Sequence, residues 1–218
     1  MIENLFSNKV IVLNATQEMW EGHLYPEEQD CIRKAVPKRR REFTAGRLCA
    51  REVLFRLGVG NFPLLVGPGR APLWPKNIVG SISHCHNLCV VVATNDKGIK
   101  GLGVDVEMAG PLEKSVLELV CTEKEKQWIA DTPPLIGSDM GKIIFSAKES
   151  LYKCLFSFTR RPLDFMDVQV VINTQTDEFD VELFNEQAAE CVKQYILLGH
   201  YFWSDDYVFT GVEIRGKD

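Results

Sequence analysis

The sequence predicts an α+β fold made of a pseudo-two-fold pair of similar subdomains, each with a helix packed on a small, mainly antiparallel sheet. The main observation is that a helix followed by antiparallel strands is expected before residue 110 and again after it. The composition agrees, because 218 residues with 45% hydrophobic and 25% charged side chains are typical of a globular chain that buries a core. We therefore expect subdomains at residues 1–108 and 109–218, with a cleft between them that is suited to a ligand.

The first half is expected to contain one long helix and several short strands. Residues 10–13 predict a strand, and residues 38–57 predict a helix that follows a proline and ends before two glycines. The Gly- and Pro-rich residues 61–76 are typical of a loop. The apolar runs 81–84 and 88–94 predict a hairpin, and residues 101–107 predict a further strand.

The second half turns helical after a Gly-Pro pair and ends in strands. Helices are expected at residues 112–120, 123–130 and 142–158. In the third of these, Ile144, Ala147 and Leu151 recur at spacings of three and four, which predicts one buried helix face. Residues 195–203 and 207–214 flank an Asp-Asp turn, so the chain is expected to close with a hairpin.

The net charge of −5 hides a basic segment. Residues 31–56 contain nine basic and two acidic residues, whereas the mildly acidic total argues against a nucleic-acid-binding protein. On the predicted helix 38–57, Arg40, Arg47 and Arg51 fall on one arc beside the buried face. This arc is either a solvated face or a phosphate-binding surface, since guanidinium groups donate two hydrogen bonds to a phosphate. The helix alone does not decide between them.

Two acidic motifs are candidates for a metal site. Asp105 and Glu107 lie two residues apart on a predicted strand, so both side chains project from one face while Val104 and Val106 point into the core. Two such carboxylates suit Mg²⁺, or they mark an exposed strand end. Glu149 and Lys153 are helix neighbours at i and i+4, and by spacing alone they form an ordinary surface pair.

Histidines and cysteines do not form a recognisable metal or disulfide pattern. His84, Cys85, His86 and Cys89 crowd one hairpin without a second ligand pair elsewhere, so zinc is disfavoured and His84 is expected to hydrogen-bond a phosphate or carbonyl. The seven cysteines have no regular spacing, which predicts free thiols and a reducing compartment. No secretory signal and no apolar run long enough to cross a membrane are found, so we expect a cytoplasmic protein.

Taken together, four segments resemble the 4′-phosphopantetheinyl transferases, most closely the monomeric two-subdomain type of siderophore and nonribosomal peptide synthesis. The pairing of G-[IV]-D-[VIL]-E with F-S-x-K-E-[SA]-x-x-K, about forty residues apart, is the specific part of the resemblance. The segments are KRRREFTAGRLCAREVL (residues 38–54), GRAPLWPKNIVGSISHC (69–85), GLGVDVE (101–107) and FSAKESLYKCLF (145–156).

The resemblance implies an activity and its partners. Such enzymes transfer the phosphopantetheine arm of coenzyme A to a serine of an apo peptidyl, aryl or acyl carrier protein, with Mg²⁺, and release 3′,5′-ADP. It further implies a monomer with the fold described above. A basic or apolar docking patch for the carrier is expected on the second subdomain, between residues 112 and 128.

The resemblance also implies roles for individual residues. The metal-binding carboxylates correspond to Asp105, Glu107 and Glu149, and the catalytic group to Asp105, Glu149 and Lys153. The residues expected to contact coenzyme A are Arg40, Arg47, Arg70, Ser83, His84, Lys148 and Lys153. The base that deprotonates the carrier serine is either Glu149 or a metal-bound water.

Two other functions fit the same motifs. The first is a non-catalytic module that binds coenzyme A or a carrier protein, although all three carboxylates and the lysine are present. The second, which is weaker, is a phosphohydrolase that acts on free coenzyme A at the same magnesium site. Metal-dependent transfer to a carrier distinguishes an enzyme from a module, and release of 3′,5′-ADP without a carrier would indicate the hydrolase.

Overall fold

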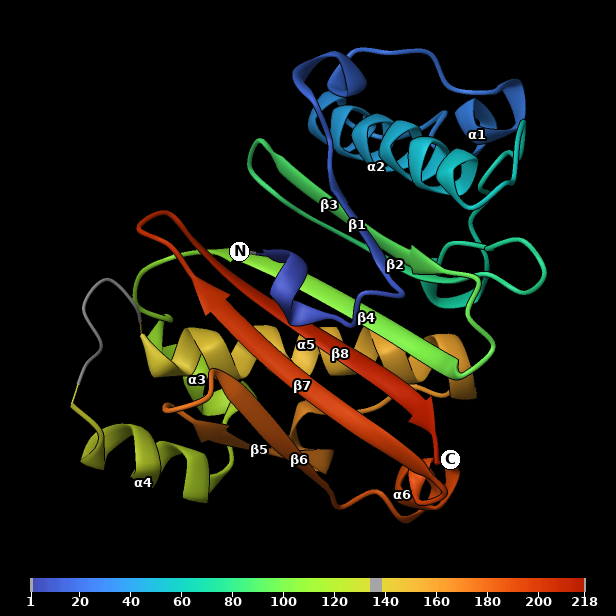
Figure 1. Cartoon of the computed structure of the whole chain (residues 1–218). Coiled ribbons are helices and arrows are strands. Elements are labelled where there is room, and N and C mark those ends of the chain that lie inside the picture. The colour runs from blue at the N-terminus through green and yellow to red at the C-terminus, as the bar shows by residue number, and fades with distance from the viewer. Residues whose placement is uncertain (1, 134–138, 218) are drawn as a thin grey trace.

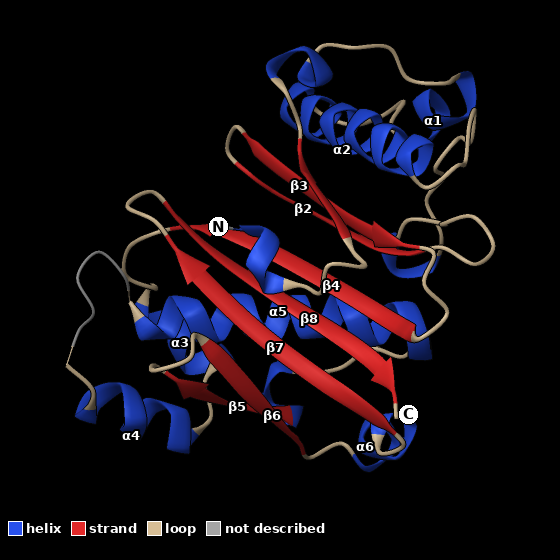
Figure 2. Cartoon of the chain, viewed as in Figure 1, coloured by secondary structure: helices blue, strands red, loops and turns tan. Residues whose placement is uncertain are grey.

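A computed structural model describes residues 2–133 and 139–217, and these form two antiparallel sheets that carry helices (Figures 1 and 2). The smaller sheet has the strand order β1-β3-β2 and is covered by α2. The larger sheet has the order β4-β8-β7-β6-β5 and is covered on one face by α5. This confirms the predicted α+β class, with a helix on an antiparallel sheet in each part, although the two sheets differ in strand number.

The first and last residues of most α-helices and strands lie close to the predicted ones, and a helix followed by a hairpin occurs in each part as predicted. The small-sheet elements are α1 (Pro26–Cys31), α2 (Pro37–Arg56), β1 (Ile11–Asn14), β2 (Val79–Cys85) and β3 (Leu88–Thr94). The large-sheet strands are β4 (Ile99–Met108), β5 (Val168–Asn173), β6 (Glu178–Leu183), β7 (Tyr195–Trp203) and β8 (Tyr207–Gly216). Its helices are α3 (Lys114–Val120), α4 (Glu123–Asp131), α5 (Met140–Thr159) and α6 (Glu186–Val192). Short 3₁₀ helices are η1 (Ile2–Leu5), η2 (Gln17–Trp20), η3 (Pro68–Arg70) and η4 (Phe165–Asp167).

Among the described α-helices and strands, four lie outside the sequence-based expectations: α1, β5, β6 and α6. Strand β6 exposes Glu178, Asp180 and Glu182 and buries only Phe179 fully, so its apolar signal is sparse. Its alternation of charged and apolar residues is nevertheless the pattern of a strand with one wet face. None of the described helices has both the length and the apolar character needed to cross a membrane.

Strand β4 hydrogen-bonds to β8, so it belongs to the larger sheet. Asp105 and Glu107 are therefore carried by the same sheet on which α5 packs, and not by the sheet that carries α2. The division of the chain into residues 1–108 and 109–218 stays a prediction. In terms of hydrogen bonding, the change from one sheet to the other comes between β3 and β4.

Strand β3 is buried on both faces, which explains its continuous apolar sequence LCVVVAT. Val91 and Ala93 pack in the cluster under α2. Val90 and Val92 point the other way, into a second cluster with Val104 of β4 and the apolar residues of η1. Because successive strand residues face opposite sides, one strand can serve two cores.

Two glycines let α5 lie directly on β4. A Cβ on Gly103 would come within 1.8 Å of the backbone oxygen of Ser150, and one on Gly101 within 2.9 Å of Cys154 Sγ. No side chain fits between the helix and the strand at these positions. Because α5 lies so close to β4, its polar face contacts Asp105, which follows Gly101 and Gly103 on the same face of the strand.

The two sheets meet where β4 lies beside β2. Here serine hydroxyls of β2 accept hydrogen bonds from backbone N–H groups of β4, as backbone carbonyls do within a sheet. The Val104 N–H donates to Ser81 Oγ at 3.1 Å, and the Val106 N–H donates to Ser83 Oγ at 3.3 Å. Both serines are buried. Unpaired buried N–H groups are costly, so the two hydroxyls stabilise an edge that would otherwise lack acceptors.

Gly103→Ala is expected to destabilise the protein by on the order of 3 kcal/mol, because the added methyl group overlaps the α5 backbone. For a chain of this size the melting temperature should fall by roughly 6–12 °C in a thermal scan. Gly60→Ala is the matched control, since a Cβ there meets nothing within 4 Å. Equal melting temperatures for the two variants would contradict the packing of α5 on β4.

Candidate active site

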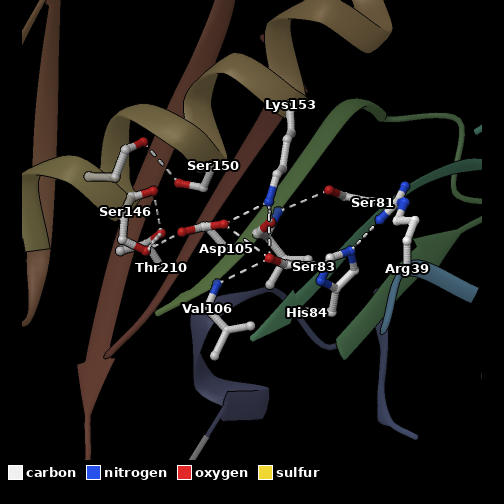
Figure 3. Close-up of polar contacts among 12 residues, drawn as sticks. Arg39, Ser81, Ser83, His84, Asp105, Val106, Ser146, Ser150, Lys153 and Thr210 are labelled. Carbon is white, nitrogen blue, oxygen red and sulfur yellow. Dashed lines mark hydrogen bonds and ion pairs between the residues drawn. The ribbon is translucent and has the colours of Figure 1, made fainter. Parts of the chain in front are cut away.

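The buried carboxylate of Asp105 is the centre of a polar cluster formed by β2, β4, β8 and α5 (Figure 3). Its Oδ1 accepts a hydrogen bond from Lys153 Nζ at 2.6 Å and from Ser83 Oγ at 3.0 Å. Its Oδ2 accepts one from Ser146 Oγ at 2.8 Å. A buried charge needs a counter-charge and hydrogen-bond donors, and this one has both.

Lys153 reaches Asp105 from α5, one turn beyond Glu149. Its ammonium also donates to Ser83 Oγ at 3.0 Å and to the Val104 carbonyl at 3.2 Å. The side chain is 27% exposed, whereas that of Asp105 is 4% exposed, so Lys153 is the open side of the ion pair. The structure therefore brings together Asp105 and Lys153 from motifs that lie 48 residues apart.

Ser83 is fully engaged by the protein. Its hydroxyl donates to Asp105, and it accepts from Lys153 and from the Val106 N–H. Its expected contact with a coenzyme stays a prediction, and in this structure its hydroxyl orients the carboxylate.

Glu107 and Glu149 lie close enough to interact electrostatically with Asp105. Burial raises the pKa of Glu107 to about 7, and the negative charges of Asp105 and Glu149 add to this effect against Lys142 and Lys153. Burial also raises the pKa of Glu149, where Lys153 opposes the effect and Asp105 reinforces it. The carboxylates are thus incompletely neutralised by the lysines around them.

In the described part of the chain, no three His, Cys, Asp or Glu side chains converge closely enough to hold a metal ion as they stand. Instead, Lys153 Nζ donates a hydrogen bond to Oδ1 of Asp105. The donor set itself suits a hard divalent cation, since it consists of carboxylate oxygens with an excess of negative charge. The three carboxylates therefore fit Mg²⁺ in kind, provided that Lys153 and the glutamates rearrange.

His84 lies beside Arg39, one of the four basic residues 38–41, of which the resemblance implies that one or two contribute to the 3′-phosphate pocket. Arg39 Nη1 lies 2.8 Å from His84 Nε2, and because arginine only donates, Nε2 is the acceptor and the ring proton is on Nδ1. Nδ1 faces Glu42 Oε2 at 3.8 Å. Burial lowers the pKa of His84, with the charges of Arg39 and Lys153 acting in the same direction and Glu42 in the opposite one.

Two arginines of the predicted arc on α2, Arg47 and Arg51, are not solvated but pack within the protein. Arg51 pairs with the buried Glu28 at 3.0 Å. Arg47 is buried over the ring of Phe43, 4.0 Å from its centroid, and its Nε has no partner among the described residues. Burial lowers the pKa of Arg47 to about 10. A buried guanidinium without an acceptor is rare unless a ligand supplies one.

Arg40 does not join these groups. Its side chain is exposed and folds back, with Nε donating to the Ala35 carbonyl at 2.9 Å and Nη2 donating to the Arg33 carbonyl. It thereby fixes the turn before α2, and its neighbour Arg39 is the one that faces β2. The helical arc placed Arg40 with Arg47, but the direction of the side chain depends on the loop before the helix.

Arg70 lines a cavity of about 360 Å³ between α5 and residues 69–82, which comprise the end of η3, the loop after it and the start of β2. Four cationic side chains line this cavity, Arg70, Lys100, Lys153 and Arg160, with Glu149 as the acidic one. Aromatic and apolar side chains form the rest of the wall: Leu73, Trp74, Tyr152 and Phe156. Lys100 and Arg160 are additions to the sequence-based set, because neither belongs to a motif.

Lys148 points away from the Asp105 cluster. It is 2% exposed, and its three N–H bonds go to Glu125 Oε2 at 2.8 Å, the Val120 carbonyl at 2.8 Å and the Phe165 carbonyl at 3.0 Å. With these acceptors in place it has no N–H left for a phosphate. Lys148 also borders a second pocket of about 220 Å³, which shares Glu149 and Tyr152 with the first.

Comparison with sequence families gives two matches that together cover most of the chain. Residues 27–94 match the 4′-phosphopantetheinyl transferase N-terminal domain. Residues 101–210 match the 4′-phosphopantetheinyl transferase superfamily. The interval between the matched regions coincides with the connection between β3 and β4.

Curated relatives include proteins that carry the same family name. The 4′-phosphopantetheinyl transferase Svp of Streptomyces mobaraensis is 37% identical over 73% of this chain and 65% of its own length. The transferase Npt of Nocardia iowensis is 32% identical over 72% of this chain and 69% of its own. Enterobactin synthase component D of Escherichia coli K12 is 30% identical over 64% and 65%. The chain thus spans about two thirds of the length of the relatives it matches.

Glu107→Gln is expected to raise the melting temperature of the metal-free protein by a few degrees at pH 8 and by less at pH 5. The folded-state pKa of about 7 lies above the ordinary 4.5, so the wild type loses stability as pH rises through that window. The glutamine variant has no such loss, so its melting temperature should exceed that of the wild type by an amount that grows from pH 5 to pH 8 in thermal scans with a chelator. Glu182→Gln, on the exposed side of β6, should show no such increase. A gap for Glu107→Gln that is independent of pH would contradict the assignment.

Proposed function

Because the chain belongs to the 4′-phosphopantetheinyl transferase superfamily, we propose that it transfers 4′-phosphopantetheine from coenzyme A to a serine hydroxyl of an apo carrier protein. The serine oxygen forms a bond to the phosphorus that bears the pantetheine, and the bond from that phosphorus to the bridging oxygen breaks. The products are the modified carrier and 3′,5′-ADP. The observation that carries the proposal is the cationic cavity that α5 shares with residues 69–82.

The charge and shape of this cavity suit coenzyme A. Four cations against one carboxylate complement a ligand with three phosphate groups, and the aromatic side chains offer a surface for a base. The volume falls in the range of ordinary small-molecule sites. Arg70 of η3 and Lys153 of α5 line the wall from different elements, so phosphates bound there would bridge η3 and α5.

The unpartnered guanidinium of Arg47 supports a second phosphate contact. A buried cation without an anion is strongly disfavoured, and a phosphate is the bidentate acceptor that a guanidinium fits best. Arg47 is therefore proposed to contact the 3′-phosphate, with Arg39 and His84 nearby on the way to Lys153. Arg40 and Ser83 have weaker support, since both are already bonded within the protein.

Asp105, Glu107 and Glu149 would hold Mg²⁺. The ion supplies neutralisation of the charge on the pyrophosphate oxygens when bound. The residues around it act directly on the reactants. Lys153 is proposed to stabilise the leaving phosphate oxygen, and Glu149 is proposed as the acceptor of the serine proton because it lines the same cavity as Lys153.

The docking surface for the carrier is proposed at the ends of α3 and η4. Leu119 is 71% exposed and Met166 is 46% exposed, although both are large and apolar. The residues that follow or precede them in the chain, Val120 and Phe165, both offer carbonyls to Lys148. Lys148 thus holds the two segments together beside Glu149, which gives this lysine a role at the carrier side of the site.

The carrier and the setting are proposed from the relatives. The printed name of the Escherichia coli relative refers to enterobactin synthesis, which supports a carrier of siderophore or nonribosomal peptide assembly. We further propose a monomer that acts in the cytoplasm, as the resemblance to the two-subdomain transferases implies.

Incubation with Mg²⁺, coenzyme A and an apo carrier protein should add one phosphopantetheine group to the carrier, as seen by mass spectrometry. Asp105→Ala and Glu149→Ala should lower the rate by on the order of a thousandfold or more while circular dichroism stays unchanged. Binding of coenzyme A without any transfer, across a panel of peptidyl, aryl and acyl carriers, would indicate a binding module. Release of 3′,5′-ADP without a carrier would indicate a hydrolase.

Arg47→Met is expected to leave the unliganded protein as stable as the wild type, or more so, because it replaces an unpaired buried cation. The rise in melting temperature on adding coenzyme A should be lost or reduced by at least half. Arg56→Met removes an exposed arginine of the same helix and is the matched control. An undiminished rise in the Arg47 variant would rule out its phosphate contact.

A further inference from the structure

The side of the Asp105 carboxylate that faces away from Lys153 is closed by two hydroxyl groups. Ser146 and Thr210 are both 0% exposed. Ser146 Oγ lies 2.8 Å from Asp105 Oδ2 and 2.9 Å from Thr210 Oγ1, and Thr210 Oγ1 donates to the Ser146 carbonyl at 2.8 Å. Figure 3 shows the three side chains in a row that leads from β8 through α5 to β4.

The direction of the hydrogen bonds in this row follows from the acceptors. An ionised carboxylate only accepts and binds a hydroxyl more strongly than a neutral oxygen does, so the single proton of Ser146 goes to Asp105. The single Thr210 proton faces two acceptors on Ser146, the carbonyl oxygen at 2.8 Å and Oγ at 2.9 Å, and a three-centre hydrogen bond shares it between them. Thr210 thus holds Ser146 by its backbone and by its hydroxyl, and Ser146 in turn donates to Asp105.

The backbone fixes both donors independently of the carboxylate. Thr210 is the direct cross-strand neighbour of Asp105 in the β4–β8 register. Ser146 lies on α5 one turn before Glu149 and two turns before Lys153, on the helix face that Gly103 brings against β4. The two oxygens of Asp105 are therefore distinguished, with Oδ2 on a closed, dry side and Oδ1 on the side of the partly exposed Lys153.

We propose that Thr210 and Ser146 are positioning residues that lock the rotation of the Asp105 carboxylate and present Oδ1 to the metal and the substrate. The inference rests on the proposed function for its consequence in catalysis. Outer hydrogen bonds of this kind commonly change metal affinity or activity by tenfold or more when they are removed. A purely structural link between α5 and β8 would lower stability without changing how the metal binds.

The test uses substitutions that remove or keep one hydroxyl in the full chain. Thr210→Val has almost the same shape and lacks the donor, whereas Thr210→Ser keeps it, and Ser146→Ala removes the direct contact to Asp105. Ser150→Ala is the matched control, because Ser150 is also 0% exposed on α5 but bonds only to the Ala147 carbonyl of its own helix.

Mn²⁺ affinity is measured by electron paramagnetic resonance, together with kcat and the KM for coenzyme A. Ser146→Ala and Thr210→Val are each expected to weaken Mn²⁺ binding and to lower kcat about tenfold, with KM changed less than about twofold. Their combination should cost little more than Ser146→Ala alone, because both act through one oxygen. Thr210→Ser should recover most of the loss, and Ser150→Ala should match the wild type.

Wild-type Mn²⁺ affinity in Thr210→Val and Ser146→Ala, or an equal loss in Ser150→Ala, would overturn the inference. If Thr210→Val does not fold, Ser146→Ala carries the same comparison. If the wild type neither binds Mn²⁺ nor transfers phosphopantetheine, the proposed function fails, and a crystal structure of metal-free Ser146→Ala decides the inference. A rotated Asp105 carboxylate is expected there, and an unmoved one would contradict it.

Discussion

The burial of one carboxylate, that of Asp105, is the constraint around which the site is organised. A charge removed from water needs a counter-charge and hydrogen-bond donors, and here they come from Ser83 of β2 and from Ser146 and Lys153 of α5. The requirement explains why α5 must touch β4 without an intervening side chain, as Gly103 allows. It also explains how two sheets with separate backbone ladders are joined, since Ser83 serves both the carboxylate and the free edge of β4.

The groups that lack full compensation are the ones that the proposed ligands would satisfy. Glu107 is held beside two other carboxylates, and Arg47 is buried without an acceptor. Without a ligand, each of these uncompensated charges would lower the stability of the folded protein. Glu107 indicates where a positive charge would bind, and Arg47 indicates where a negative charge would bind. The two together fit a magnesium-bound phosphate ester.

Periodicity and spacing in the sequence carried most of the fold and the centre of the site. The apolar run of β3, the buried face of α5 and the alternation in GVDVE predict these elements, and Val104 and Val106 do point into the core. The spacing of Glu149 and Lys153 predicts that they share a helix face, but only the family resemblance assigned them a function. Strand β6 escaped prediction because it buries one residue fully among exposed acids, whereas the apolar sequence VQVVIN of β5 does carry the signal of a strand.

The remaining site residues depend on tertiary contacts that no local pattern encodes. Lys148 and Lys153 are five residues apart on one helix, yet one is turned into an ion pair with Glu125 and the other toward Asp105. Arg39 replaces Arg40 beside His84 because the turn before α2 captures Arg40. Lys100, Arg160, Ser146 and Thr210 come from different elements, and only the packing of α5 on the sheet brings them to the site.

The central claim, that the pyrophosphate of coenzyme A and a divalent cation meet at Asp105, is tested most directly by ³¹P nuclear magnetic resonance of bound coenzyme A during titration with Mn²⁺. The account predicts that the pyrophosphate resonances broaden at lower Mn²⁺ than the 3′-phosphate resonance, which is assigned to Arg47. The difference should disappear in Asp105→Ala. Equal broadening of all three phosphates, or selective broadening that survives in Asp105→Ala, would contradict the account.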